Sequence, residues 1–174
     1  MTYKSFLRIL KVAPIVALSL LLNGCGFYSF TGANVDPSVK SFQVNYFQNT
    51  AEVVEPGIER QFTQRLQNLI QNQTNLSLTN AGGDLVYEGE ITEFRVSPMA
   101  ATASQRAAQN RLTIRVMVRY TNKKKEADNF EKSFSFYHDY GANELLTGSV
   151  LTAALDDIFE RITQDIFNES LAKW

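Results

Sequence analysis

The sequence predicts an α+β fold: two helices packed on one face of a mainly antiparallel sheet, in the order strand, helix, strands, helix. Two segments carry apolar residues at helical spacing, and several shorter segments alternate apolar with polar residues. Two of the alternating segments are joined by a connection too short for a parallel crossover. The chain contains no internal repeat and is expected to form a single domain over residues 39–174.

A strand and a helix are expected to begin the domain. Residues 39–47 alternate, with Phe42 and Val44 on the apolar side of the strand. Pro56 suits the first turn of a helix, and this helix should end near Gln73, where the apolar residues stop recurring. Its apolar stripe consists of Ile58, Phe62, Leu66, Leu69 and Ile70.

A short strand at 76–78 and a turn at 80–84 lead into a longer strand. The apolar residues of this longer strand fall on odd positions up to Ile91 and on even positions from Phe94 onward. Because successive side chains of a strand point to opposite faces, this change of parity predicts a β-bulge near Thr92–Glu93.

The two clearest strands span 112–120 and 130–140, and residues 122–129 join them as an antiparallel hairpin. Their apolar faces are expected to form the core of the sheet. The predicted core residues are Leu112, Ile114, Val116, Val118, Phe134 and Phe136. Residues 97–110, which are rich in Ala, Ser, Thr and Gln, are expected to form a mobile loop.

A wide apolar stripe from Glu144 onward predicts a long C-terminal helix. The stripe contains Leu151, Leu155, Ile158, Phe159, Ile162, Ile166 and Phe167. Two amphipathic helices can cover only one face of such a sheet, so the other face is expected to meet water or a partner.

Residues 1–24 have the architecture of a signal peptide, with positive charges within residues 1–11 followed by an apolar stretch at 12–22. That stretch is too short to span a hydrocarbon core of about 30 Å. The quartet Leu22-Asn23-Gly24-Cys25 resembles the bacterial lipobox, in which the cysteine thiol takes a diacylglyceryl group and the chain is cleaved just before it. The alternative is an ordinary secretory signal whose cysteine is incidental.

Lipidation of Cys25 would anchor the chain to a membrane through its new N-terminus. Residues 25–38 would then form a lipidated tether, which contains the turn-forming residues Gly32 and Pro37. In lipoproteins, an Asp directly after the lipidated Cys tends to mean retention in the inner membrane, and Gly26 stands there in this chain. The expected location is therefore the outer membrane, with the domain facing the periplasm.

The charge balance predicts no nucleic-acid partner. The leader contains three basic residues and no acid, which leaves 14 basic and 18 acidic residues in the rest of the chain. The run Lys123-Lys124-Lys125-Glu126 is interpreted as a solvated hairpin tip rather than a contact for a polyanion.

The sequence predicts neither a metal site nor an enzyme. Its single His and single Cys exclude a site built from several such ligands, and no catalytic glycine or histidine motif is present. His138 is interpreted as a hydrogen-bonded core or edge histidine rather than a general base. Glu88 and Glu90 share one strand face and are interpreted as solvated charges, like Asp156-Asp157 on the C-terminal helix.

Arg111, Arg115 and Arg119 recur at intervals of four along one strand, on the face opposite the core. Two interpretations stay open for this row. The arginines pair with Glu131 and Asp139 on the neighbouring strand, or they form a surface for phosphate or carboxylate groups, which guanidinium forks bind through two parallel hydrogen bonds.

Several segments together resemble the LptE family of lipopolysaccharide-assembly lipoproteins, in particular its divergent short branch. They are the lipobox followed by Gly-Phe-Tyr-Ser-Phe, the strand Ser41-Phe42-Gln43-Val44-Asn45-Tyr46-Phe47, the stretch Gly89-Glu90-Ile91-Thr92-Glu93-Phe94, and Asn110-Arg111-Leu112-Thr113. The resemblance runs over nearly the whole chain after the leader.

The resemblance implies two helices on a mainly antiparallel sheet, with no cofactor besides the lipid on Cys25. It also implies a role as plug and assembly partner of the outer-membrane β-barrel that inserts lipopolysaccharide, and direct binding of lipopolysaccharide. The arginine row is an inference from the residues and is not carried over from the family. The alternatives are a periplasm-facing lipoprotein that scaffolds another envelope complex, and a hydrolase, which would need a pocket of converging titratable groups.

Overall fold

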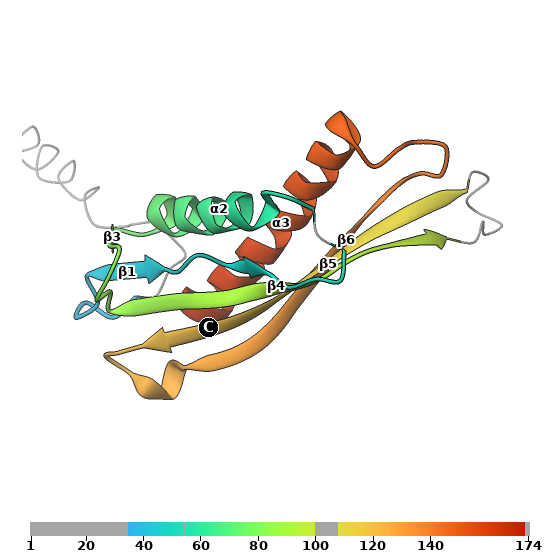
Figure 1. Cartoon of the computed structure of the whole chain (residues 1–174). Coiled ribbons are helices and arrows are strands. Elements are labelled where there is room, and N and C mark those ends of the chain that lie inside the picture. The colour runs from blue at the N-terminus through green and yellow to red at the C-terminus, as the bar shows by residue number, and fades with distance from the viewer. Residues whose placement is uncertain (1–34, 54, 100–107, 173–174) are drawn as a thin grey trace, which may run out of the picture. The chain divides into compact units, whose positions relative to one another are not determined.

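Two helices lie on the same side of a six-stranded sheet in this computed structural model, which describes residues 35–53, 55–99 and 108–172 (Figure 1). The helices are α2 (Ile58–Gln73) and α3 (Gly148–Leu171). The strands are β1 (Ser41–Val44), β2 (Gln48–Asn49), β3 (Ser77–Leu78), β4 (Leu85–Met99), β5 (Gln109–Asn122) and β6 (Phe130–Gly141). The predicted α+β class is confirmed.

The strand order is β3-β1-β4-β5-β6, and β2 pairs with β4 further along the same side as β1. β4, β5 and β6 pair antiparallel over most of their lengths. β1 and β3 are parallel neighbours because α2 carries the chain back to the start of the sheet. The sheet is therefore mainly antiparallel, as predicted, with short parallel pairs at one edge.

Both helices begin later than predicted. Gly57 has a left-handed backbone, with φ of 88°, which separates Pro56 from the first helical residue Ile58. The C-terminal helix starts at Gly148 rather than near Glu144. The Glu144 side chain instead accepts a hydrogen bond of 2.8 Å from the Gly141 N–H, which holds these residues in a turn.

The predicted core residues lie on the face that the helices cover. Leu112, Ile114, Val116 and Val118 are fully buried, and Phe134 is 7% exposed. Phe136 is only partly buried against this core. The two helices meet through Phe62 and Phe159, whose ring centroids lie 5.2 Å apart, and none of the helices in the described ranges is long and apolar enough to cross a membrane.

The predicted bulge is confirmed, because the register between β4 and β5 shifts between Ile91 and Glu93. β4 and β5 also come unusually close before the bulge. A Cβ atom on Gly89 would collide with the carbonyl oxygen of Met117, and it would lie 2.9 Å from the Phe47 ring. Only glycine allows this approach of the two backbones.

The prediction of a loop over 97–110 is wrong at both ends. Ser97 pairs with Arg111 and Met99 pairs with Gln109, so β4 and β5 extend as a paired stem. The middle of that segment, residues 100–107, lies outside the described residues, as do Cys25 and the predicted signal peptide.

Candidate interaction surface

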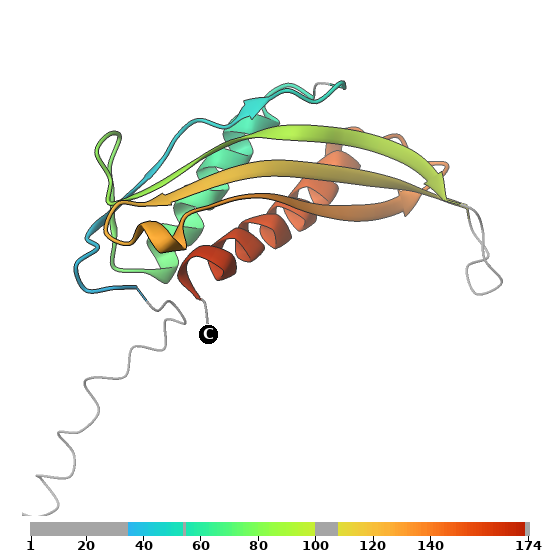
Figure 2. The ribbon, with the colours of Figure 1, turned by 90° about the horizontal axis from the view of Figure 1, so that it is seen from below.

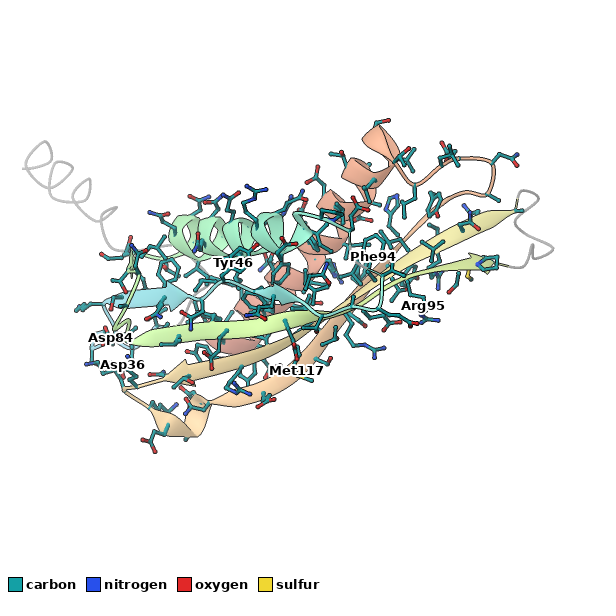
Figure 3. All side chains as sticks on the ribbon, viewed as in Figure 1. Asp36, Tyr46, Asp84, Phe94, Arg95 and Met117 are labelled. Atoms are coloured by element: carbon teal, nitrogen blue, oxygen red, sulfur yellow. The ribbon has the colours of Figure 1, made fainter. Side chains whose placement is uncertain are left out.

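The face of β4, β5 and β6 that points away from the helices carries Arg111, Arg115 and Arg119, as the alternation predicts. Figure 2, which views the molecule from below Figure 1, looks onto this uncovered face. Met117 extends to the same side from the middle of β5 (Figure 3). The strand positions place the arginines in one row, with Thr113 and Met117 between them.

Arg111 is the most enclosed of the three arginines. Its Nε donates to Asp139 Oδ1 at 2.7 Å and its Nη2 donates to Asp139 Oδ2 at 2.8 Å. The guanidinium carbon also lies 3.6 Å from the centroid of the Tyr137 ring. The hydrogen bonds from Arg111 lower the pKa of Asp139 below its ordinary value, so this carboxylate stays charged as the partner of Arg111.

Arg119 bridges two neighbouring strands. Its Nε donates to Glu131 Oε2 on β6 at 3.1 Å, and its Nη1 donates to Glu88 Oε1 on β4 at 3.2 Å. The bonds to Glu131 and Glu88 raise the pKa of Arg119. Cross-strand pairing, the first of the two interpretations of the arginine row, is observed for Arg111 and Arg119. Glu88, which was interpreted as a solvated charge, forms an ion pair with Arg119.

Arg115 pairs with Glu93, a partner that was not predicted from the sequence. Its Nη2 lies 3.1 Å from Glu93 Oε2, while the other oxygen of Glu93 accepts a bond of 2.6 Å from Arg95 Nε. Glu93 reaches the uncovered face only because the bulge at Ile91 reverses the parity of β4. The parity change in the sequence was the signal that could have predicted this pair.

The uncovered face is close to charge-balanced. Four arginines on β4 and β5 lie among five carboxylates, which occupy β4 and β6 on either side of the arginine row. The carboxylates are Glu88, Glu90, Glu93, Glu131 and Asp139. An incoming phosphate would compete with a carboxylate for both nitrogens of the Arg111 fork, whereas Arg115 engages Glu93 through a single nitrogen and its side chain is 48% exposed.

His138 connects the sheet to the C-terminal helix. Its Nδ1 lies 2.7 Å from Asp157 Oδ2 on α3, and its side chain is 29% exposed. Asp156, the neighbour of Asp157, pairs with Arg65 on α2 at 2.8 Å. Asp157 thus connects α3 to β6, and Asp156 connects α3 to α2. The contact with Asp157 agrees with the interpretation of His138 as a hydrogen-bonded edge histidine.

Glu90 is also accounted for, because its Oε2 accepts a hydrogen bond of 3.0 Å from the Thr50 hydroxyl. Glu88 and Glu90 are therefore bonded to different partners and do not converge on one site. Within the ranges that the structure describes, no group of three His, Cys, Asp or Glu side chains could hold a metal ion.

The lysine run at the hairpin tip is partly paired. Lys124 Nζ lies 3.2 Å from Asp84 Oδ1, and Lys125 Nζ lies 2.9 Å from Asp128 Oδ1. The Lys40 N–H donates to Asp84 Oδ2 at 2.9 Å, and this bond, with the Lys124 side chain next in importance, lowers the pKa of Asp84 to about 2. Asp84 therefore ties the hairpin tip to the start of β1.

A family model described as LptE, lipopolysaccharide-assembly, matches residues 39–170 of the chain. No curated protein matches the chain. Among solved structures, uncharacterized lipoprotein B from Nitrosomonas europaea is 12% identical and aligns over 82% of this chain and 87% of its own, with a TM-score of 0.50. That likeness shows a shared fold.

Two further solved structures align with lower scores. A hypothetical protein from Chlamydia trachomatis is 10% identical and covers 76% of this chain and 98% of its own, with a TM-score of 0.48. A minor lipoprotein from Acinetobacter baumannii is 12% identical and covers 77% of this chain and 97% of its own, with a TM-score of 0.47.

Proposed function

This chain belongs to the LptE family of lipopolysaccharide-assembly proteins, and from that membership we propose that it assembles with the outer-membrane β-barrel that inserts lipopolysaccharide and binds lipopolysaccharide during its transport. The observation that carries the proposal is the match over residues 39–170, which runs from just before β1 to the last turn of α3. Membership of the family identifies the process as lipopolysaccharide assembly. The uncovered sheet face is the surface that we propose takes part in it.

We propose that Cys25 is lipidated and anchors the chain to the outer membrane, with the domain facing the periplasm. The lipobox residues Leu22 and Gly24 support the modification, and Gly26 in place of an aspartate supports the location. Several acyl chains on one residue bind a membrane far more firmly than one chain, because each buried CH₂ contributes about 0.8 kcal/mol.

A plug role is supported by the composition of the uncovered face. The interiors of large outer-membrane barrels are polar, and this face presents alternating arginines, carboxylates and hydroxyls rather than an apolar patch. Since both helices cover the opposite face of the sheet (Figure 1), the uncovered face is the one available to a polar barrel wall. A charge-balanced surface can pair with such a wall without leaving a large unpaired charge.

We propose further that the row of Arg111, Arg115 and Arg119 contacts the barrel or the phosphates of lipopolysaccharide. Arg115 and Arg119 are the more accessible members, with side chains 48% and 55% exposed, against 28% for Arg111. Anionic ligands would exchange with the carboxylates that now bind these guanidinium groups, so the row would bind phosphate by competition rather than as a set of unpaired cations.

The proposal is tested by purifying an affinity-tagged full-length chain from native membranes in mild detergent. Expected products are one large outer-membrane barrel in near-stoichiometric amount and lipopolysaccharide above the level of an untagged control. A Cys25→Ala variant should remain an uncleaved precursor and recover much less of the barrel. Recovery of a different envelope complex without a barrel would favour the alternative, a lipoprotein that scaffolds that complex.

A further inference from the structure

Beyond the bulge, strand β4 has a neighbour on one side only within the described residues. β2 pairs with β4 up to Asn49 and Ile91, and the Thr50 N–H donates to the Ile91 carbonyl at 2.9 Å. After this bond the chain leaves the edge of β4, while β4 continues to Met99 in pairing with β5. Among the described residues, the edge from Phe94 onward is therefore unpaired.

The pairing pattern identifies which backbone groups lie on this edge. Even-numbered residues of β5 direct their N–H and C=O groups toward β6, since the Ala108 carbonyl accepts the Ala142 N–H at 3.1 Å and the pattern alternates from there. Phe94 lies opposite Ile114, and Val96 lies opposite Leu112. The N–H and C=O groups of Phe94 and Val96 consequently point outward, away from β5.

An apolar groove lies along the same edge. It has a volume of about 440 Å³ and is lined by Glu52, Val53 and residues 92–96. Val53 and Val96 are 58% and 44% exposed, while Phe94 is 7% exposed and packs into the core. Figure 3 shows Phe94 and Arg95 at this part of β4. Unpaired strand groups beside exposed valines are a typical template for a further strand.

The rim of the groove carries the charged side chains of Glu52, Glu93 and Arg95. Glu52 is exposed and has no ion pair within the described part of the chain, whereas Glu93 already binds Arg95 and Arg115. A segment that fits this groove therefore combines an apolar side chain with a basic one that reaches Glu52.

The other two edges of the sheet differ from the edge of β4 at Phe94. β3, at one end, has two residues. On the outer strand β6, Lys132 pairs with Glu169 of α3 at 2.7 Å, and the last outward N–H, that of Gly141, is bonded to Glu144. Charged side chains at such positions prevent another strand from pairing. On β4, Pro98 lacks an outward N–H and ends the open edge after Val96.

We propose that the edge of β4 at Phe94 and Val96 accepts an extended segment of the barrel partner, which adds to the sheet as a strand in line with β2. Its backbone bonds to the outward groups of Phe94 and Val96, its apolar side chain enters the groove beside Val53, and its basic side chain pairs with Glu52. The identity of the partner rests on the proposed function, and the edge itself rests on the geometry of β4.

The test compares Val96→Pro with Val96→Thr in the tagged full-length chain. Proline removes the outward N–H and leaves every bond between β4 and β5 intact, whereas threonine keeps both the N–H and the branched shape. Recovery of the barrel should fall about tenfold for Val96→Pro and change little for Val96→Thr, because lost strand pairing leaves polar groups of the partner unsatisfied. Thermal unfolding of each purified variant checks that the domain is folded.

A second pair of variants, Val53→Asp and Val53→Thr, tests the groove without touching the sheet, and Val53→Asp should also lose the barrel. Normal recovery with Val96→Pro and Val53→Asp would overturn strand addition and leave the proposed function intact. Equal losses with Val96→Pro and Val96→Thr would overturn it as well, because threonine preserves the pairing. If the wild-type chain recovers no barrel, the result contradicts the proposed function and the barrel as the partner of this edge.

Discussion

Arg111 on β5 and Asp139 on β6 form a bidentate ion pair, with two hydrogen bonds of 2.7 and 2.8 Å. The guanidinium fork that could receive a phosphate is thus already occupied by a carboxylate, and the Tyr137 ring fixes its position. This pair is the most enclosed ion pair on the uncovered face, and its neighbours in the arginine row are more exposed.

A double-mutant cycle on this pair should show favourable coupling. Arg111→Gln, Asp139→Asn and the double variant are compared by urea unfolding, and the sum of the two single losses should exceed the loss in the double variant. The same cycle on Arg119 and Glu131 should give a smaller coupling energy, because both side chains are more than half exposed and solvent screens them. A larger coupling energy for Arg119 and Glu131 than for Arg111 and Asp139 would contradict this expectation.

Asp84 should make the stability of the domain depend on pH in the acid range. Its pKa of about 2 in the folded chain lies below the ordinary value of 3.8, so the folded state binds the proton less readily than the unfolded state. The charged Asp84 carboxylate therefore contributes its full stabilisation above about pH 4, and this stabilisation disappears as the pH falls toward 2. Urea unfolding between pH 2 and 7 should show Asp84→Asn less stable than wild type at neutral pH, with the difference shrinking over this interval. A constant difference would mean that the charge of Asp84 contributes nothing.

Ile114 tests which face of the sheet is the core. It is fully buried under the helices, and Ile114→Ala should lower the free energy of unfolding by about 2–5 kcal/mol because it leaves a cavity. Thr113→Ala, one residue away on the uncovered face, is the matched control and should cost less than about 0.5 kcal/mol. Similar losses for both variants would show that both faces are packed.

Most of the fold could be predicted because its signals are periodic. Apolar residues at every second position identified β5 and β6, and the change of parity after Ile91 located the bulge. The paired ends of β4 and β5, on both sides of 100–107, were not predicted. They pair through their backbones, and their side chains lack the alternation that identifies a strand. The parallel pair of β1 and β3 was also missed, because β3 has two residues and too little pattern to show a partner.

The interaction surface was predicted in part. Spacing by four placed the three arginines on one face, and the partners of Arg111 and Arg119 followed from the neighbouring strand. The pair of Arg115 and Glu93 could not be seen without applying the bulge to β4. The groove beside Val53 and Phe94 was not predicted either, because it depends on where the chain leaves the edge of β4 after Thr50.

Exchanging the members of one ion pair tests the arginine row. A chain with Arg119→Glu and Glu131→Arg keeps its pair across β5 and β6, and Glu88→Gln is added because Glu88 would otherwise repel the new glutamate, so the domain should remain folded. If the row binds phosphate, adding Arg115→Gln to this exchange should weaken binding of purified lipopolysaccharide about tenfold, as measured by fluorescence titration. Unchanged affinity in a folded variant would show that the row only pairs the strands, and the contact surface would have to be sought elsewhere.

The central claim, that this chain acts in lipopolysaccharide assembly, is tested most directly by depleting it in its own cells and measuring newly made lipopolysaccharide at the cell surface. Surface delivery should fall as the chain is depleted and return when the wild-type gene is restored. Delivery that continues at the normal rate in fully depleted cells would contradict the claim.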